Sequence, residues 1–358
     1  MTCRTARMVA CLAALLFLSG ASSLAGDGEP LATRRFEFTY EVRVPAVPAG
    51  SGPVRLWIPL PATDRYQEIT GLRIESPVAY KTQRDTEYRN LFAYFEVDPQ
   101  HAASGFTVVL RFQVNRREHR VDVNGHRAAT RDPAPTKAEL ARLLRPDKLV
   151  PLDGVIGELA RQETQGVSDP LTRARKIYDY VVATLRYDKS GQGWGRGDAI
   201  FACTAKRGNC TDFHALFIGM MRASGIPARF EIGFPLPLDK TEGDIPGYHC
   251  WAEFHLDGVG WVPVDASEAW KNPAKREYFF GAHDQNRVLF TYGRDIRLSS
   301  AQQGEPLNYF IYPYAEVGGK TFSQLQTHFA FRDVRPAASS PGKPAPASGE
   351  ASRTSGRR

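Results

Sequence analysis

Three residues of the chain have the types that catalysis by a thiol requires: Cys210, His249 and Asp265. Apolar residues recur at helical spacing after Cys210, and Asn209 or Thr211 is a candidate helix cap. We therefore expect Cys210 at or just before the first turn of a helix. Unpaired N–H groups and the positive end of the helix dipole favour a thiolate there, and thiolate is the reactive form. Position alone leaves a buried, inert cysteine as the alternative.

His249 and Asp265 belong to two predicted strands, residues 248–256 and 261–265, and the Asp257-Gly258 pair between them favours a turn. Side chains alternate along a strand, so a hairpin that joins the apolar faces puts His249 and Asp265 together on the other face. A carboxylate bonded to one ring nitrogen orients an imidazole, while the other nitrogen faces a nucleophile. The spacing equally fits a core histidine beside a turn aspartate.

Residues 26–124, ahead of these elements, have the pattern of strands. Residues 35–44 alternate polar and apolar side chains without a slip, and shorter runs continue the pattern as far as Val114. Gly, Pro and Ser punctuate the runs, so we expect an antiparallel β-sandwich. The predicted faces hold no cluster of cysteines, histidines or paired carboxylates, which favours a packing or spacer role over ligand binding.

A proline-rich stretch, residues 125–155, is expected to link the sandwich to a second domain, residues 156–335. In that domain Asp169-Pro170 begins a predicted helix as cap and first-turn proline. The glycine-rich segment 187–198 contains Trp194 and is a candidate loop beside a substrate. It lacks the glycine patterns of nucleotide-binding loops, so no nucleotide site is expected.

The two ends of the chain predict export and a flexible tail. Residues 1–25 combine two arginines, an apolar run and a small-residue exit, which indicates a cleaved signal peptide and a periplasmic or secreted protein. No later stretch is apolar for long enough to span a membrane. Residues 336–358 are rich in Pro, Ala, Ser and Gly, and we expect them to be disordered. Removing the charges of both ends leaves 7 − 2 − 3 = +2, which gives no case for nucleic-acid binding.

After signal cleavage three cysteines remain, Cys203, Cys210 and Cys250, so at least one thiol must stay free of intramolecular disulfides. A Cys203–Cys250 disulfide or three free thiols would leave Cys210 reactive, whereas a Cys203–Cys210 disulfide would silence it. The same cysteines with His249 and His255 could ligate zinc. They include no Cys-x2-Cys or His-x3-His pair, so we expect no metal site and no cofactor.

Three blocks of sequence, in this order and at these spacings, resemble the transglutaminase-like superfamily of cysteine enzymes. The blocks are residues 208–212 at the start of the helix that ends at 223–229, residues 248–254, and residues 260–265. The resemblance covers about residues 156–300. It implies an α+β, papain-like core behind the β-sandwich, with Cys210 as nucleophile, His249 as base and Asp265 as the residue that orients the histidine.

The resemblance implies a cysteine acyl-transfer enzyme acting on amide bonds of peptides or proteins, and the predicted signal peptide implies that this enzyme is exported. A protease or amidase and a transamidase would use the same triad, and Trp194 is a candidate second oxyanion donor or wall of the site. The chain lacks the C-terminal β-domains and calcium loop of the animal members, which speaks against calcium dependence and protein cross-linking. The alternative is a non-catalytic exported module that binds a protein through the sandwich.

Overall fold

The structure, a computed structural model, describes residues 30–48, 50–123 and 135–334. The predicted signal peptide and the predicted disordered tail lie outside these residues. Two five-stranded antiparallel sheets share one apolar core and form the β-sandwich that the alternating pattern predicts. In β1 (Thr33–Val44) the side chains of Phe36, Phe38, Tyr40 and Val42 are fully buried, as a period of two requires.

The strands of the sandwich come from both ends of the described chain. The first sheet has the order β11-β18-β1-β6-β3 and the second the order β17-β16-β2-β5-β4. The remaining bounds are β2 (Val54–Pro59), β3 (Gln67–Glu75), β4 (Tyr80–Arg84), β5 (Leu91–Val97), β6 (Phe106–Arg117), β11 (Glu242–Asp244), β16 (Tyr314–Val317), β17 (Lys320–Thr321) and β18 (Gln326–Asp333).

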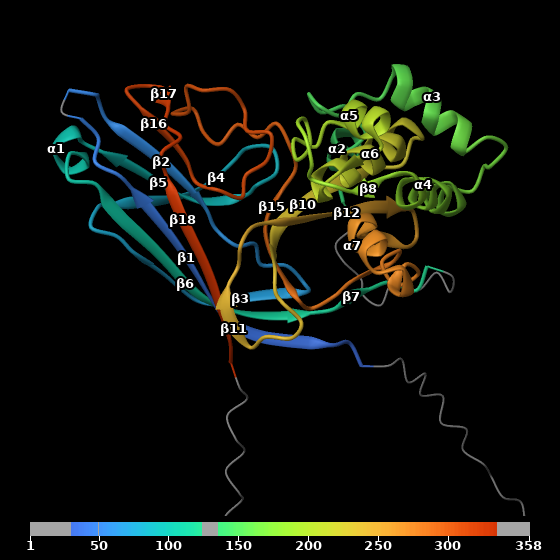
Figure 1. Cartoon of the computed structure of the whole chain (residues 1–358), viewed down its shortest axis with the longest axis horizontal. Coiled ribbons are helices and arrows are strands. Elements are labelled where there is room, and N and C mark those ends of the chain that lie inside the picture. The colour runs from blue at the N-terminus through green and yellow to red at the C-terminus, as the bar shows by residue number, and fades with distance from the viewer. Residues whose placement is uncertain (1–29, 49, 124–134, 335–358) are drawn as a thin grey trace, which may run out of the picture. The chain divides into compact units, whose positions relative to one another are not determined.

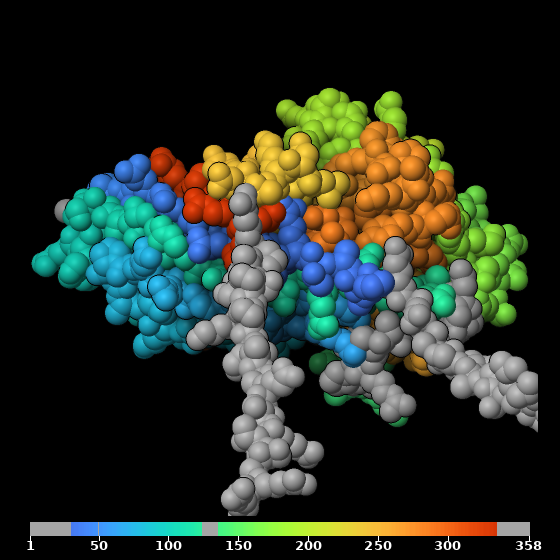
Figure 2. Space-filling model, turned by 90° about the horizontal axis from the view of Figure 1, so that it is seen from below, coloured from blue at the N-terminus to red at the C-terminus, as the bar shows by residue number. Residues whose placement is uncertain are grey.

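Strands near the C-terminus complete both sheets. β18 pairs with β1 and β16 pairs with β2, so red C-terminal strands lie beside blue N-terminal ones in Figure 1. The space-filling view of Figure 2 likewise shows red atoms against blue ones. Residues 314–333 were assigned to the second domain by sequence, but they contribute strands to the sandwich. These strands pair with partners that are far away in sequence, so no local sequence pattern predicts the pairing.

The second part of the fold places a layer of helices on a four-stranded antiparallel sheet of order β13-β12-β10-β15 (Figure 1), which confirms the α+β class. The helix α6 packs on β12, and all of its residues except the last are buried. The bounds are α2 (Lys137–Arg142), α3 (Gly154–Glu163), α4 (Pro170–Thr184), α5 (Ala199–Ala205), α6 (Cys210–Ala223), α7 (Ala266–Lys271), β10 (Ala228–Pro235), β12 (His249–Leu256), β13 (Gly260–Val264) and β15 (Arg287–Tyr292).

Several short elements complete the described fold. They are α1 (Pro99–Ala102), β7 (His119–Arg120), β8 (Arg186–Tyr187), β9 (Arg207–Gly208), a 3-10 turn (Pro273–Lys275) and β14 (Ala282–His283). The predicted linker includes α2. This helix begins with a capping box formed by Thr136 and Glu139. Residues 124–134 of that linker lie outside the described residues. None of the helices in the described ranges combines the length and apolar character needed to cross a bilayer.

The close approach of β15 to β10 depends on Gly233, which pairs with His249 of β12. A Cβ at this glycine would lie 1.8 Å from the carbonyl oxygen of Val288. We therefore expect Gly233→Ala to lower the free energy of unfolding by about 3 kcal/mol or more, as overpacking of a tight core does. Urea unfolding followed by circular dichroism measures this loss.

Gly247→Ala is the matched control, because a Cβ there meets nothing closer than 3.7 Å. Equal unfolding midpoints for the two variants would contradict the close packing at Gly233.

Candidate active site

Cys210 is the first residue of α6, and the preceding Asn209 is its cap. The Asn209 side chain accepts the N–H of Thr211 at 3.0 Å, and the Asp212 carboxylate accepts the N–H of Asn209 at 2.9 Å. This is a capping box, which satisfies N–H groups that a helix start leaves free. The Cys210 thiol therefore sits at the positive end of a buried, well-fixed helix.

Asp212 also fixes the glycine-rich loop against the start of α6. Its two carboxylate oxygens accept the N–H groups of Gly195 at 2.7 Å and Gly197 at 3.0 Å. A buried carboxylate held by several backbone donors rigidifies both partners. Sequence reasoning missed this role, although Asp212 stands in the third helical position where a capping residue is expected.

The predicted hairpin forms with the predicted faces. β12 and β13 pair so that Ala252 lies opposite Val264 and Phe254 opposite Val262. On the other face, Nε2 of His249 lies 2.7 Å from Oδ2 of Asp265, just past the end of β13. Since Asp265 occupies Nε2, Nδ1 is the ring nitrogen that is left for the Cys210 thiol.

The charges of this group favour a thiolate and imidazolium pair. Burial alone would raise the pKa of the Cys210 thiol, but hydrogen bonds with Cys250 and His249 lower that pKa well below its usual range. Burial alone would lower the pKa of His249, but the carboxylate of Asp265 raises it to about 10. The Cys210 side chain is only 2% exposed, so these interactions act away from bulk water.

Asp265 is fully buried and held by four groups. Besides His249, it accepts Nη1 of Arg287 at 3.1 Å, the Ser267 hydroxyl at 3.1 Å and the N–H of Glu268 at 3.0 Å. Burial would raise the pKa of this carboxyl, but the charge of His249 and the Arg287 guanidinium hold it well below its usual range. Asp265 therefore stays ionised while it also caps α7.

His214 connects the start of α6 to the start of α7. Its Nδ1 donates to the Cys210 carbonyl at 2.8 Å, and its Nε2 accepts the N–H of Ala266 at 3.2 Å. Burial lowers the pKa of His214, so the ring is neutral. Its Nδ1 also lies 3.7 Å from the sulfur of Cys250. Sequence reasoning identified neither His214 nor Arg287. His214 lies one helical turn after Cys210, but its contact with Ala266 joins segments that are distant in sequence, as does the contact of Arg287 with Asp265.

Cys203, Cys210 and Cys250 are all free thiols in the described part of the chain. Cys250 is buried beside Cys210, and burial raises its pKa well above the usual range, so it remains a thiol and donates to the Cys210 sulfur. Cys203 is half-buried in α5, and burial likewise raises its pKa. Only Cys210 of these three has a lowered pKa.

Trp194 is half-buried, and its indole N–H donates to the Gly191 carbonyl at 3.1 Å within the same loop. That bond occupies the indole donor, so in this arrangement an oxyanion role would require the donor to exchange partners. Four tyrosines, rather than Trp194, have hydroxyl groups that interact electrostatically with Cys210. Burial raises the pKa of each. They are Tyr187, Tyr248, Tyr309 and Tyr312.

Comparison with known proteins relates the whole arrangement to one family. Residues 157–266 match the Transglutaminase-like superfamily. An uncharacterized protein of Haemophilus influenzae is 30% identical over 326 residues, which cover 79% of this chain and 86% of that protein. A candidate cysteine protease from Cytophaga hutchinsonii shares the fold: its crystal structure has a TM-score of 0.57 and 16% identity, and the match covers 86% of this chain and 93% of that one. The periplasmic domain of TgpA from Pseudomonas aeruginosa matches at a TM-score of 0.35 and 17% identity, over 68% of this chain and 91% of that one.

Proposed function

Because this chain belongs to the transglutaminase-like superfamily, we propose that it is an exported cysteine enzyme that transfers acyl groups from amide bonds of peptides or proteins. Cys210 is the nucleophile, His249 the general base and acid, and Asp265 the residue that orients the imidazole. The observation that carries the proposal is the 2.7 Å contact between Nε2 of His249 and Asp265, with Nδ1 left for the thiol at the start of α6.

In the first half of the reaction the Cys210 thiolate attacks the carbonyl carbon of the amide. The new C–S bond pushes the π electrons onto oxygen, and the oxyanion is stabilised by the N–H of Cys210 and a second donor. When the C–N bond breaks, His249 gives its proton to the leaving amine. A thioester on Cys210 and a neutral imidazole result.

In the second half the neutral His249 takes a proton from the acyl acceptor as that acceptor attacks the thioester. Water gives a carboxylic acid, and an amine gives a new amide; either step restores the thiolate and imidazolium pair. The triad serves both acceptors equally, so the choice between hydrolysis and transamidation depends on what reaches the thioester. The tyrosines around Cys210 would form the apolar part of that approach.

Export is part of the proposal and rests on residues 1–25 of the sequence, whose basic, apolar and small-residue segments have the order of a signal peptide. An oxidising compartment makes it notable that no disulfide joins Cys203, Cys210 and Cys250 in the described residues. Detection of a mature chain lacking about 25 residues in the periplasmic or culture fraction would support export.

The proposed pairing of Cys210 and His249 predicts the pH dependence of alkylation. Because its pKa is lowered, Cys210 should react with iodoacetamide well below about pH 8, whereas Cys203, whose pKa is raised, should react only in strongly basic solution. Peptide mapping of the native protein after brief labelling at a series of pH values gives the rate for each thiol.

Cys203 is the internal control for reagent access, because it is more exposed than Cys210. The proposal fails if Cys210 of the folded protein shows the same rise in rate with pH as an ordinary thiol.

A further inference from the structure

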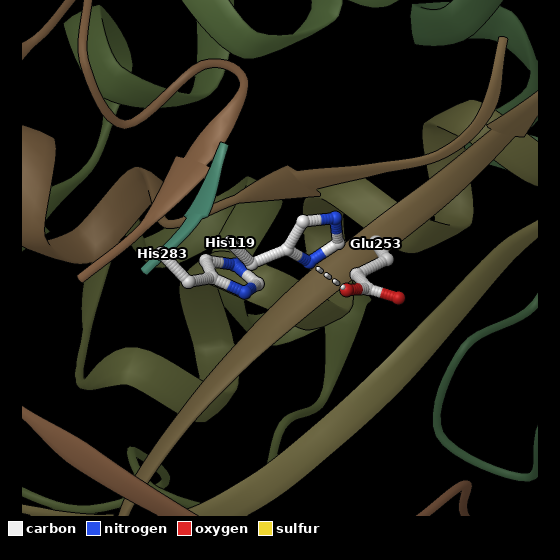
Figure 3. Close-up of side chains that lie close together, drawn as sticks. All are labelled: His119, Glu253 and His283. Atoms are coloured by element: carbon white, nitrogen blue, oxygen red, sulfur yellow. Dashed lines mark ion pairs between the residues drawn. The ribbon is translucent and has the colours of Figure 1, made fainter. Parts of the chain in front are cut away.

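A second group of ionisable side chains lies away from Cys210, where β7 and β14 meet the four-stranded sheet that contains β12 and β13. His119 of β7, Glu253 of β12 and His283 of β14 converge there (Figure 3) and are 2%, 3% and 0% exposed. One nitrogen or oxygen of each lies within 4.8 Å of the others. Three such groups in an interior of this kind need partners, because a buried polar atom without one is costly.

His283 has an unused ring nitrogen. Its Nε2 lies 3.2 Å from the carbonyl oxygen of Val264, which can only accept, so Nε2 carries the proton. Nδ1 is therefore an unprotonated acceptor, and within the described residues it has no hydrogen-bond partner. A histidine that donates one N–H to a backbone carbonyl and presents its other nitrogen is the usual arrangement of a metal ligand.

His119 and Glu253 complete the set. Nδ1 of His119 lies 3.0 Å from Oε1 of Glu253, while its Nε2 has no partner among the described residues. Arg229 donates to the other carboxylate oxygen of Glu253, and the Tyr66 ring stacks on the His119 ring at 3.7 Å between centroids. Oε2 of Glu253 is thus bound by Arg229, whereas Oε1 faces the two histidines.

Both imidazoles are available as neutral ligands. Burial lowers the pKa of His119 to about 3, and burial with the nearby Arg287 guanidinium lowers that of His283 well below its usual range. A pocket of about 320 Å³ that has His119, Glu253, Arg229 and Tyr66 in its lining offers an ion a path to the group.

We propose that His119, Glu253 and His283 bind one divalent transition-metal ion, with Zn²⁺ the best match to two imidazoles and a carboxylate. The ion would replace the hydrogen bond between His119 and Glu253 and would use the free nitrogen of His283. The ion would crosslink β7 and β14 to β12. β7 follows the sandwich strand β6, and β12 begins with His249. The site goes beyond the proposed acyl transfer and does not depend on it.

The test uses the mature chain with Cys210→Ala, which removes the reactive thiolate as a competing metal ligand. After chelation and removal of the chelator, Zn²⁺ is titrated in a calorimeter, and Co²⁺ is titrated in parallel as a spectroscopic probe. We expect one equivalent of either metal and the visible bands of four- or five-coordinate Co²⁺, without the sulfur charge-transfer band of a cysteine site. No binding at micromolar metal, or a thiolate spectrum, would overturn the proposal.

Substitutions locate the site. Loss of a residue that only hydrogen-bonds to a metal ligand weakens metal affinity by about 10- to 100-fold. His119→Gln and His283→Gln each remove a ligand, so each should weaken the affinity for Zn²⁺ by more than that. His101→Gln and His328→Gln, at residues that are 69% and 53% exposed, should leave it unchanged. Unchanged affinity in both cluster variants would overturn the proposal.

A further variant covers the case in which loss of a buried histidine unfolds the protein. His283→Cys keeps a ligand for the metal, so it should bind Co²⁺ and add the sulfur charge-transfer band that the parent protein lacks. Circular dichroism checks the fold of each variant. A folded His283→Cys protein that binds Co²⁺ without that band would place the metal elsewhere and overturn the assignment.

Discussion

Cys210→Ala should abolish turnover of amide substrates, with a fall of about 10⁵- to 10⁶-fold in kcat, because removal of a catalytic nucleophile leaves only the binding and oxyanion contributions. The change deletes a single sulfur atom at the first position of α6, where alanine is a good helix former, so the fold should persist. Turnover is measured by mass spectrometry on a peptide mixture. Hydrolysis products gain water, whereas transamidation releases ammonia or joins an amine.

Cys203→Ala is the matched control, because Cys203 is also a free thiol but lies half-buried in α5. It should keep wild-type turnover and wild-type labelling of Cys210. If the Cys210→Ala protein, folded by circular dichroism, retains turnover within about tenfold of wild type, a nucleophilic role for Cys210 is untenable. The alternative of a non-catalytic binding module would then gain ground.

The hairpin that brings His249 to Asp265 could be predicted from sequence because its information is local. Alternation fixes which side chains share a face, and Asp257-Gly258 fixes where the chain turns. The start of α6 was equally local, since a cap and a helical period occupy neighbouring residues. These patterns paired His249 with Asp265 and put Cys210 at the start of a helix. That the three residues act together was implied only by the resemblance to the transglutaminase-like superfamily.

What surrounds the triad could not be predicted, because both faces of β12 are buried. His249 and Glu253 are 4% and 3% exposed, so the polar face of the strand is covered as fully as the apolar one. His119 and His283, from distant segments, lie against this face. The carboxylate of Glu253 pairs with Arg229 of the neighbouring strand β10. Alternation distinguishes the two faces of a strand, but it does not say what covers each.

The indole of Trp194 shows the limit of composition. A lone tryptophan among glycines suggests close approach to a substrate, yet its N–H bonds to Gly191 of its own loop. The residue that organises this loop is Asp212, whose carboxylate reaches two of its glycines. Backbone hydrogen bonds of this kind depend on the path of the loop in space, which its glycine content does not specify.

Asp265→Asn should lower kcat by about 10³- to 10⁴-fold, because an amide orients the imidazole without stabilising its positive charge. The carboxylate raises the pKa of His249 to about 10, so its loss lowers that pKa and raises the pKa of Cys210 in turn. Less thiolate then exists at neutral pH. Iodoacetamide labelling of Cys210 should become slow at pH 6 to 7 and approach the wild-type rate in strongly basic solution.

Labelling is a better probe of this pair than stability. In the unfolded chain the pKa of His249 is 6.5 and that of Cys210 is 9.0. Between these pH values the pair of side chains therefore carries one proton, which is on the thiol. The folded chain also carries one, on the imidazole, because the Cys210 pKa is lowered and the His249 pKa is raised. Equal proton counts give no slope of unfolding free energy with pH in this window, even though the proton has moved.

Glu268→Gln is the matched control for loss of a negative charge near His249. Its Oε1 lies 3.9 Å from Nε2 of His249, too far for a hydrogen bond, and it accepts instead from Lys271 at 2.7 Å. Asn at 265 can still accept the N–H of Glu268, so α7 keeps its cap in the test variant. If Glu268→Gln lowers turnover and shifts the labelling profile as much as Asp265→Asn does, the effect belongs to net charge, and Asp265 has no special orienting role.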